Sequence, residues 1–254
     1  MKKIVAFAGF ALLSVGAFAQ TNLQVFYDLG KDRKYVTSTL EMFKGDDWGN
    51  TFFFVDYDHN NKNADDKIIS PNGTYMEIAR CFNFWGESAL APLSLQVEYN
   101  GGFGEFGNGA GAYPIEKAWL IGVDYFLHNS DFSNTFNIKV LYKHFPLNKG
   151  IPVQFTGVWG MQNLFGVEGL RFSGFADLWG QDASYITKYD ATTGLPTETK
   201  DTKWVFISEP QIWYSVGQFF NCPNFNLGCE FELSYNFTQH GFMFNPCIGA
   251  KWDF

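Results

Sequence analysis

Charged and aromatic side chains recur at every second position along parts of this sequence, and that spacing limits the chemistry they could perform. Between positions 226 and 237, Glu230 and Glu232 alternate with Phe231 and Leu233. Successive side chains of a β-strand point to opposite faces, so the acids share one face and the apolar side chains share the other. This arrangement is typical of a strand with lipid on one side and a water-filled interior on the other.

The same alternation predicts which side chains would face such an interior. Rings offer stacking surfaces for flat or apolar solutes, and nearby acids and bases can hydrogen-bond the polar edges of those solutes. An alternative is that these side chains fill and cross-link the interior of a closed barrel. The residues expected to point inward are the acids Asp28, Glu41, Glu77, Glu98, Asp124, Glu209, Glu230 and Glu232, the bases Lys139, Lys143, Arg171 and Lys251, and the aromatic residues Phe26, Phe52, Phe54, Phe175, Trp179 and Trp213.

Two motifs are similar to cofactor or ion sites, but their surroundings argue against both. Residues 102–107 match G-x-G-x-x-G, yet a glycine-rich loop and then a strand are expected after them, whereas a dinucleotide site needs a helix. Residues 56–60 resemble the start of a calcium loop, but Asn61 and Lys67 replace the required Gly and Glu. We expect no cofactor and no dedicated metal site. Divalent ions that bridge the loop at 56–66 to lipopolysaccharide remain an alternative to a simple solvated acidic loop.

Hydrolytic chemistry finds little support in the sequence. The four histidines are scattered, and only His144 falls on a predicted strand, with no serine clearly paired with it. Neither a nucleophile elbow nor an H-E-x-x-H motif occurs. We therefore do not expect an enzyme.

The elements that carry these side chains are strands from position 23 to the end of the chain. Aromatic residues make up 19% of the sequence, while mean hydropathy is near zero (−0.14), a combination expected of a lipid-facing barrel. A soluble sandwich or lipocalin-like barrel would have to bury the inward charges in a dry core. We predict an all-β, transmembrane, antiparallel up-and-down β-barrel of about 12 strands. The strands are expected near 22–29, 35–43, 50–58, 74–84, 93–100, 116–127, 135–145, 153–164, 169–180, 203–216, 226–237 and 246–254.

The two ends of the chain read as export and assembly signals. Lys2 and Lys3 precede an apolar run that ends in Ala17-Phe18-Ala19, so we predict a signal peptide over 1–19 and the barrel over 20–254. The last strand ends in Phe254, a feature recognised by the machinery that assembles outer-membrane barrels. These signals predict the outer membrane of a Gram-negative cell, with the longer loops at 58–73, 101–114 and 181–202 outside.

The net charge and the cysteines limit the expected partners and the possible disulfides. The net charge is −8, and loss of Lys2 and Lys3 makes the mature chain −10, so nucleic acid is not an expected partner. Cys222 and Cys229 flank one predicted turn and are close enough in sequence to pair, whereas Cys81 and Cys247 are isolated. Whether the first two form a disulfide or stay free thiols is open at this stage.

Several segments resemble the nucleoside-specific channel-forming outer-membrane porins (the Tsx family). They are residues 40–48 with the aromatic strand to Asp58, Thr74-Tyr75-Met76-Glu77-Ile78-Ala79-Arg80, residues 118–124, 171–182 and 249–254. The chain looks like a distant member, shorter than typical ones, and is also similar to an uncharacterised family of small exported barrels.

The resemblance implies a monomeric twelve-stranded barrel with a narrow pore that binds nucleosides. Glu77 and Arg80 occupy the motif's acidic and basic positions. Strict alternation puts Arg80 on the lipid side, so both would point inward only if a bulge lay near Ala79.

Two hypotheses follow. The first is a channel for passive, selective uptake of small solutes, nucleosides foremost, with outer-membrane lipid and lipopolysaccharide around it. Its expected pore lining is Glu41, Phe52, Phe54, Glu77, Arg80, Asp124, Arg171, Phe175 and Trp213. The second is a closed outer-membrane barrel with a surface-binding or structural role carried by the long loops.

Overall fold

The computed structural model describes residues 20–254 except 32, 63–67, 71, 107–110 and 147. The predicted signal peptide, 1–19, lies outside the described residues. Short strands β4 (Asn61–Lys62) and β5 (Ile68–Ser70) and the 3₁₀ turns η2 (Leu164–Gly166) and η3 (Val216–Phe220) lie in the connections. The remaining strands are β1 (Gln20–Asp28), β2 (Val36–Asp46), β3 (Gly49–His59), β6 (Gly73–Phe82), β7 (Leu93–Phe106), β8 (Gly111–His128), β9 (Asn134–His144), β10 (Val153–Met161), β11 (Leu170–Tyr189), β12 (Pro196–Ser208), β13 (Gln211–Tyr214), β14 (Phe225–Tyr235) and β15 (Phe242–Asp253).

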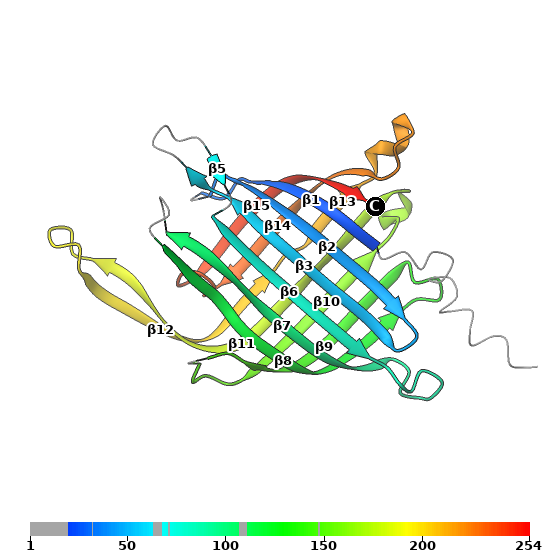
Figure 1. Ribbon diagram of the computed structural model, residues 1–254, viewed down its shortest axis with the longest axis horizontal. Helices are drawn as coiled ribbons and strands as arrows, with labels where there is room; N and C mark the ends of the chain where they lie inside the picture. Colours follow the sequence, from blue (N-terminus) through cyan, green and yellow to red (C-terminus); the bar gives the residue numbers. More distant parts are fainter. Residues whose placement is uncertain (1–19, 32, 63–67, 71, 107–110, 147) are drawn as a thin grey trace, which may run out of the picture.

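These strands form one closed antiparallel barrel, as the sequence predicted (Figure 1). Each strand pairs with its neighbours in the chain, and β1 pairs with β15, so the first and last strands complete the wall. Strands β12 and β13 occupy a single position, because both pair with β11 on one side and β14 on the other. The described residues therefore build a barrel of twelve strand positions.

The break between β12 and β13 falls at Glu209 and Pro210. Proline has no N–H to donate to a neighbouring strand, so the ladder is interrupted there. The register continues regardless: Ser208 pairs with Leu233, and Gln211 pairs with Glu230. The predicted strand at 203–216 is thus correct in place but divided.

Two of the predicted long loops are wrong, because the strands run on beyond the barrel rim. Residues 101–106 continue β7, residues 111–114 belong to β8, and most of 181–202 continues β11 and β12. The β11–β12 hairpin projects well away from the barrel in Figure 1. Residues 102–106 of the G-x-G-x-x-G segment accordingly lie in β7, and the next described element is strand β8, where a dinucleotide site would need a helix.

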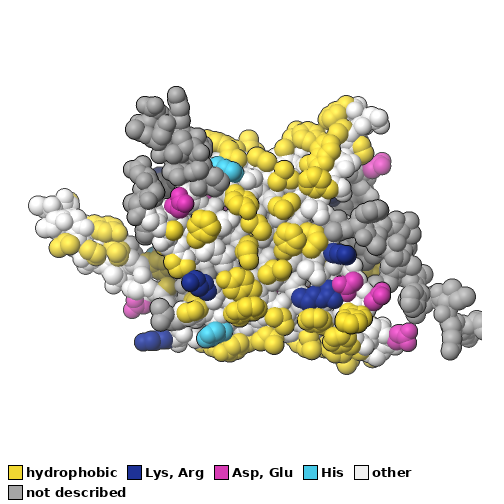
Figure 2. Space-filling view, viewed as in Figure 1, with side chains coloured by type: hydrophobic (Ala, Val, Ile, Leu, Met, Phe, Trp, Pro, Cys, Tyr) yellow, Lys and Arg dark blue, Asp and Glu magenta, His cyan; other side chains and the backbone are white. Residues whose placement is uncertain are grey.

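The wall has polar side chains on its inner face and apolar side chains on its outer face, the reverse of a soluble barrel. On β1, Asn22, Gln24 and Asp28 are buried, whereas Leu23 and Val25 are 40% and 43% exposed. Figure 2 shows hydrophobic side chains spread over the middle of the visible outer face, with charged ones mostly toward its ends. Within the described residues, no helix is long and apolar enough to cross a membrane.

The four cysteines are free thiols in this structure. Cys81 and Cys247 are buried, and the register places both on the inner face of the wall. Cys222 lies in the turn after η3, whereas Cys229 lies on the outer face of β14. The disulfide left open by the sequence is therefore absent between Cys222 and Cys229.

Candidate functional site

The interior of the barrel brings together four of the residues expected to line a pore. Glu41 pairs with Phe54 across β2 and β3, and Phe54 pairs with Glu77 across β3 and β6. Phe52 lies two positions from Phe54 on the same face, with the ring centroids 6.1 Å apart. All four are partly exposed, so none of them is fully packed into the wall.

Hydrogen bonds from polar neighbours orient the two acids of this wall, Glu41 and Glu77. The Asn22 amide donates to Glu41 at 2.8 Å. Glu77 accepts hydrogen bonds from the Tyr75 hydroxyl at 2.8 Å and from the Asn100 amide at 3.0 Å. The Tyr75 ring also lies 6.0 Å from that of Phe54, which places an aromatic pair beside a carboxylate.

The opposite wall contributes Phe175 and Arg171 from β11. Phe175 faces inward and is partly exposed. Arg171 donates to Asn226 at 2.7 Å and pairs with Asp253 at 3.0 Å. Since Asp253 pairs with Asn22 at the start of β1, Arg171 lies at the end of the lumen where the chain termini meet.

Two other predicted lining residues face inward but are packed away. Trp213 is 0% exposed, with the Phe26 ring 5.5 Å away and the Lys251 ammonium 4.5 Å from its centroid. Asp124 is 4% exposed and accepts two bonds from the Asn137 amide, at 2.8 and 3.0 Å. In this structure both form part of the packed wall, so neither lines open space.

The position of Arg80 on the outer face contradicts the prediction that this residue lines the pore. The register runs without a bulge past Ala79, and Arg80 pairs with outward-facing Thr51. Its guanidinium instead holds the Asp46 carboxylate by two bonds, at 2.6 and 2.8 Å. Such a fork of two parallel bonds suits arginine. Here it ties β6 to the last residue of β2 on the outer wall.

Several lumenal residues were missed by the sequence analysis. Asp56 and Asp58 were assigned to an acidic loop, but they continue the inward face of Phe52 and Phe54 on β3. Asp177 lies between Phe175 and Trp179 on the inward face of β11. Strict alternation along each strand would have found all three.

Arg33 is the missed residue that no sequence pattern indicates. It belongs to the connection between β1 and β2, at the end of the barrel opposite the termini. Its side chain reaches Asp28 at 3.1 Å and Glu232 at 2.8 Å. It therefore links β1 and β14 across the last strand of the barrel, inside the mouth.

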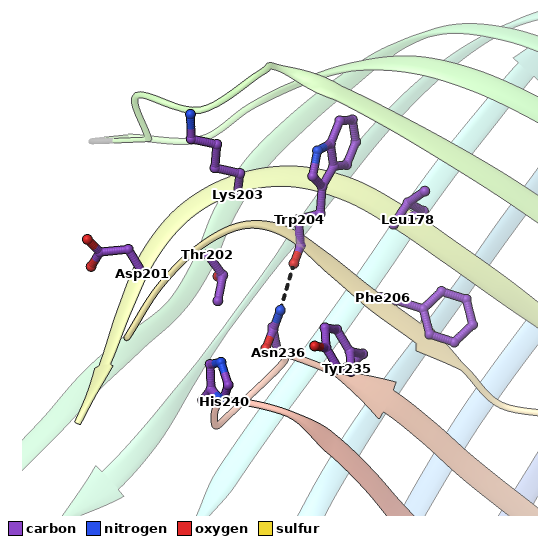
Figure 3. A pocket seen from close by; sticks show the side chains of 9 residues that line it. All are labelled: Leu178, Asp201, Thr202, Lys203, Trp204, Phe206, Tyr235, Asn236 and His240. Carbon is purple, nitrogen blue, oxygen red and sulfur yellow. Dashed lines mark hydrogen bonds between the residues drawn. The ribbon is translucent and has the colours of Figure 1, made fainter. Parts of the chain in front are cut away.

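A separate groove of about 340 Å³ lies on the rim, where β12 diverges from β14 (Figure 3). Pairing between these strands stops at Phe206 and Tyr235. Beyond that point the Asn236 amide donates to the Trp204 carbonyl at 3.4 Å. The groove is lined by Leu178, Asp201, Thr202, Lys203, Trp204, Phe206, Tyr235, Asn236 and His240.

No set of three His, Cys, Asp or Glu side chains is arranged to hold a metal ion in the part of the chain that the structure describes. The acids at the start of the calcium-like segment lie on β3. Asp65 and Asp66, farther along the loop at 56–66, fall outside the described residues.

A closed twelve-position barrel with a polar interior and an apolar outer face has the fold of the outer-membrane porins. The structure of the NanC porin matches with a TM-score of 0.51 at 10% identity, over 92% of this chain and 100% of that one. The KdgM porin covers 92% of this chain and 99% of its own at 8% identity and a TM-score of 0.47. OpdK of Pseudomonas aeruginosa, solved with vanillate, covers 93% and 98% at 7% identity and a TM-score of 0.38.

The chain belongs to the family described as domain of unknown function DUF5020, whose model matches residues 19–254. No curated protein matches the sequence. The family description assigns no solute, so the nucleoside specificity implied by the resemblance to the Tsx family stays a prediction.

Proposed function

We propose that this protein is a passive, non-enzymatic channel of the outer membrane that admits small solutes, with nucleosides as the first class to test. The outer face offers lipid a band of apolar side chains, whereas the inner face carries most of the charge. A closed barrel leaves no strand edge unpaired, which is the condition for crossing lipid with β-structure. In this proposal the surrounding partners are membrane lipid and lipopolysaccharide, and the barrel acts as a monomer.

The observation that carries the proposal is the uneven packing of the interior. Glu41, Phe54 and Glu77 on one wall and Phe175 on the other remain partly exposed, while Gln96, Leu120 and Leu141 are almost fully buried. Any passage is therefore narrow and bounded by rings beside acids. Such a lining can stack on a flat base and hydrogen-bond its polar edge.

The orientation follows from the pairing of the termini. In outer-membrane barrels the short turns face the periplasm and the longer connections face outside. With Asn22 beside Asp253 at the end that bears the β2–β3 turn, that end would be periplasmic. The β11–β12 hairpin would then project from the cell surface. Strand β15, with Phe254 after it, would present the signal to the assembly machinery.

The channel is tested by conductance in planar lipid bilayers. The purified full-length chain should conduct, and added nucleoside should reduce the current. Phe54→Ala should weaken this block by about tenfold in nucleoside concentration, because loss of one stacking ring costs about 1–3 kcal/mol. Phe53→Ala is the matched control, since Phe53 is the neighbouring ring on the outward face of β3. Absence of any conductance would overturn the channel, and equal block in both variants would overturn the nucleoside assignment.

A closed barrel with a surface-binding role is the second candidate, and one observation favours it. Much of the interior is packed, including Trp213 and Asp124, while the rim carries a projecting hairpin and a groove at its base (Figures 1 and 3). Removal of residues 183–202 would then abolish the biological role without changing conductance. If the wild-type channel conducts, and nucleoside blocks the deletion variant as strongly as it blocks the wild type, the first candidate is favoured.

A further inference from the structure

The charge of the lumen indicates which solutes could pass, and this inference rests on the proposed channel function. Carboxylates clearly predominate among the described side chains inside the barrel. The lumenal acids are Asp28, Glu41, Asp56, Asp58, Glu77, Glu98, Asp124, Asp177, Glu209, Glu230, Glu232 and Asp253, and the lumenal bases are Arg33, Lys139, Lys143, Arg171 and Lys251.

Neutral donors hold several of these carboxylates. Asp56 accepts a bond from the Thr39 hydroxyl at 2.5 Å, and Glu230 accepts one from the Gln211 amide at 2.6 Å. Glu77 is held by a tyrosine hydroxyl and an asparagine amide. A hydroxyl or an amide can orient a carboxylate, but it brings no positive charge. The negative charge of these side chains is therefore not cancelled by the groups that fix them.

Two of the lumenal lysines lie on aromatic rings. The Lys143 ammonium is 4.2 Å from the centroid of Trp179, and that of Lys251 is 4.5 Å from the centroid of Trp213. The two arginines are held at opposite ends of the barrel, Arg33 by Asp28 and Glu232 and Arg171 by Asp253. These four bases are thus held at the ends of the barrel or against its wall, while the fifth, Lys139 on β9, lies opposite Asp124 on β8.

Carboxylates from different walls also act on one another across the interior. Glu209, between β12 and β13, is within electrostatic range of Glu77 on β6 and of Asp56 on β3. Asp56 is in turn within range of Glu230 on β14. Carboxyl groups that face one another in this way attract a mobile cation whenever they are ionised.

A second kind of observation points to a ligand in the same place. The Asn100 side-chain oxygen has no hydrogen-bond donor among the described residues, although Asn100 is only 1% exposed. Its amide donates to Glu77, so the unpartnered oxygen lies beside that carboxylate. The Gln154 side-chain oxygen, on a residue 2% exposed, is also unpartnered. A buried acceptor without a donor is costly, and a cation or a solute N–H would satisfy it.

We propose that the lumen selects by charge: it passes alkali cations, protonated amines and neutral solutes rich in N–H and O–H groups, and it excludes carboxylate and phosphate anions. Rings of Asp and Glu side chains confer cation preference on other channels by the same electrostatics.

The test is the reversal potential of the wild-type channel in a potassium chloride gradient. At about 0.1 M salt, where charges act over about 10 Å, we expect K⁺ to be favoured over Cl⁻ on the order of tenfold. In about 1 M salt, where the range falls to about 3 Å, this preference should shrink. A conducting channel that is unselective or favours Cl⁻ overturns the inference and leaves the channel itself standing. A chain that inserts but never conducts overturns the proposed function instead.

Variants locate the source of the preference. Glu77→Gln combined with Glu209→Gln should reduce the K⁺/Cl⁻ ratio severalfold, because it removes two ionisable carboxyl groups from facing walls while keeping side-chain shape. Asp190→Asn is the control, since it removes an acid at the far tip of the projecting β11–β12 hairpin (Figure 1), and its ratio should match the wild type. Equal ratios in all three proteins would show that the lumenal carboxylates do not set selectivity. If the double variant fails to fold, the wild-type protein can be tested by liposome swelling with glucosamine and with glucuronate. Faster entry of glucuronate, the anion, would refute the inference.

Discussion

Arg80 shows how one side chain can belong to a recognisable motif and yet lie on the wrong face for the role that the motif implies. Its position in the Met-Glu-Ile segment predicted a base in the pore beside Glu77. The unbroken register on both sides of β6 places the two on opposite faces. Alternation along the strand gave the correct face, and only the assumed bulge at Ala79 was wrong.

The outward position of Arg80 leads to a direct test. Arg80→Ala removes the paired bonds to Asp46, but both side chains are substantially exposed to solvent (24% and 42%), so stability should fall by only about 0–1 kcal/mol. The reversal potential should not change, because the charge lies outside the lumen. A shift of reversal potential toward greater cation preference would show that Arg80 faces the pore after all.

Asp190 is a residue whose ionisation should affect the tip of the β11–β12 hairpin. It lies at the tip of the β11–β12 hairpin, where its carboxylate accepts bonds from the backbone amides of Thr193 at 2.7 Å and Thr192 at 2.9 Å. These bonds hold the pKa of Asp190 below its ordinary value. A depressed pKa means that the ordering of the tip is complete above the unfolded pKa of about 3.9. It is lost as the pH falls through the lower, folded value.

Nuclear magnetic resonance can check this expectation through the Thr193 amide. In the wild type its chemical shift should titrate with a midpoint below about 3.9. In Asp190→Asn it should be insensitive to pH over the same interval. A wild-type midpoint at or above the ordinary value would contradict the hydrogen-bonded tip.

At the scale of elements, close packing between strands limits substitution at certain glycines. Gly228 on β14 lies against Trp213, and an added Cβ would come within 2.2 Å of the Ile212 carbonyl oxygen and 2.5 Å of the indole ring. No side chain fits there without displacing the tryptophan from its contacts with Phe26 and Lys251.

Gly228→Ala should therefore destabilise the barrel by about 1–3 kcal/mol, the usual cost of overpacking. The measurement is the temperature at which the folded band disappears in electrophoresis without prior boiling. Gly45→Ala is the control, because the nearest atom to its added Cβ is 4.0 Å away. Equal transitions in the two variants would mean that the wall around Trp213 adjusts freely.

The strands themselves could be predicted from the sequence because a period of two persists wherever one face meets lipid and the other meets polar groups. Their ends could not. Residues 101–106 and 183–189 have no lipid to face, so nothing in their hydropathy separates strand from loop, yet both pair with a neighbour. Backbone pairing alone extends these hairpins past the rim.

At the scale of the whole molecule, alternation predicted which of these side chains face the lumen, but it did not predict which of them are exposed there and which are buried. Alternation tells which face Trp213 and Asp124 share with Glu77, and the register confirms it. How tightly each is packed depends on contacts between strands far apart in the chain, such as that of Trp213 with Phe26. Arg33 escaped prediction for the same reason, since its partners Asp28 and Glu232 meet only when β1 and β14 have been brought together through β15.

The pairing of β1 with β15 has a consequence for how the protein must come into being. Nearly every other pairing joins strands that follow one another in the chain and can form as soon as both are available. The β1–β15 seam joins the two ends of the fold, so until the last strand has been delivered, β1 remains an open edge able to join another chain. The wall is therefore complete only when β15 has paired with both β14 and β1, and an exposed β1 edge carries a risk of aggregation until then. Loss of residues 242–254 would remove no pairing among the earlier strands, but the barrel could not close.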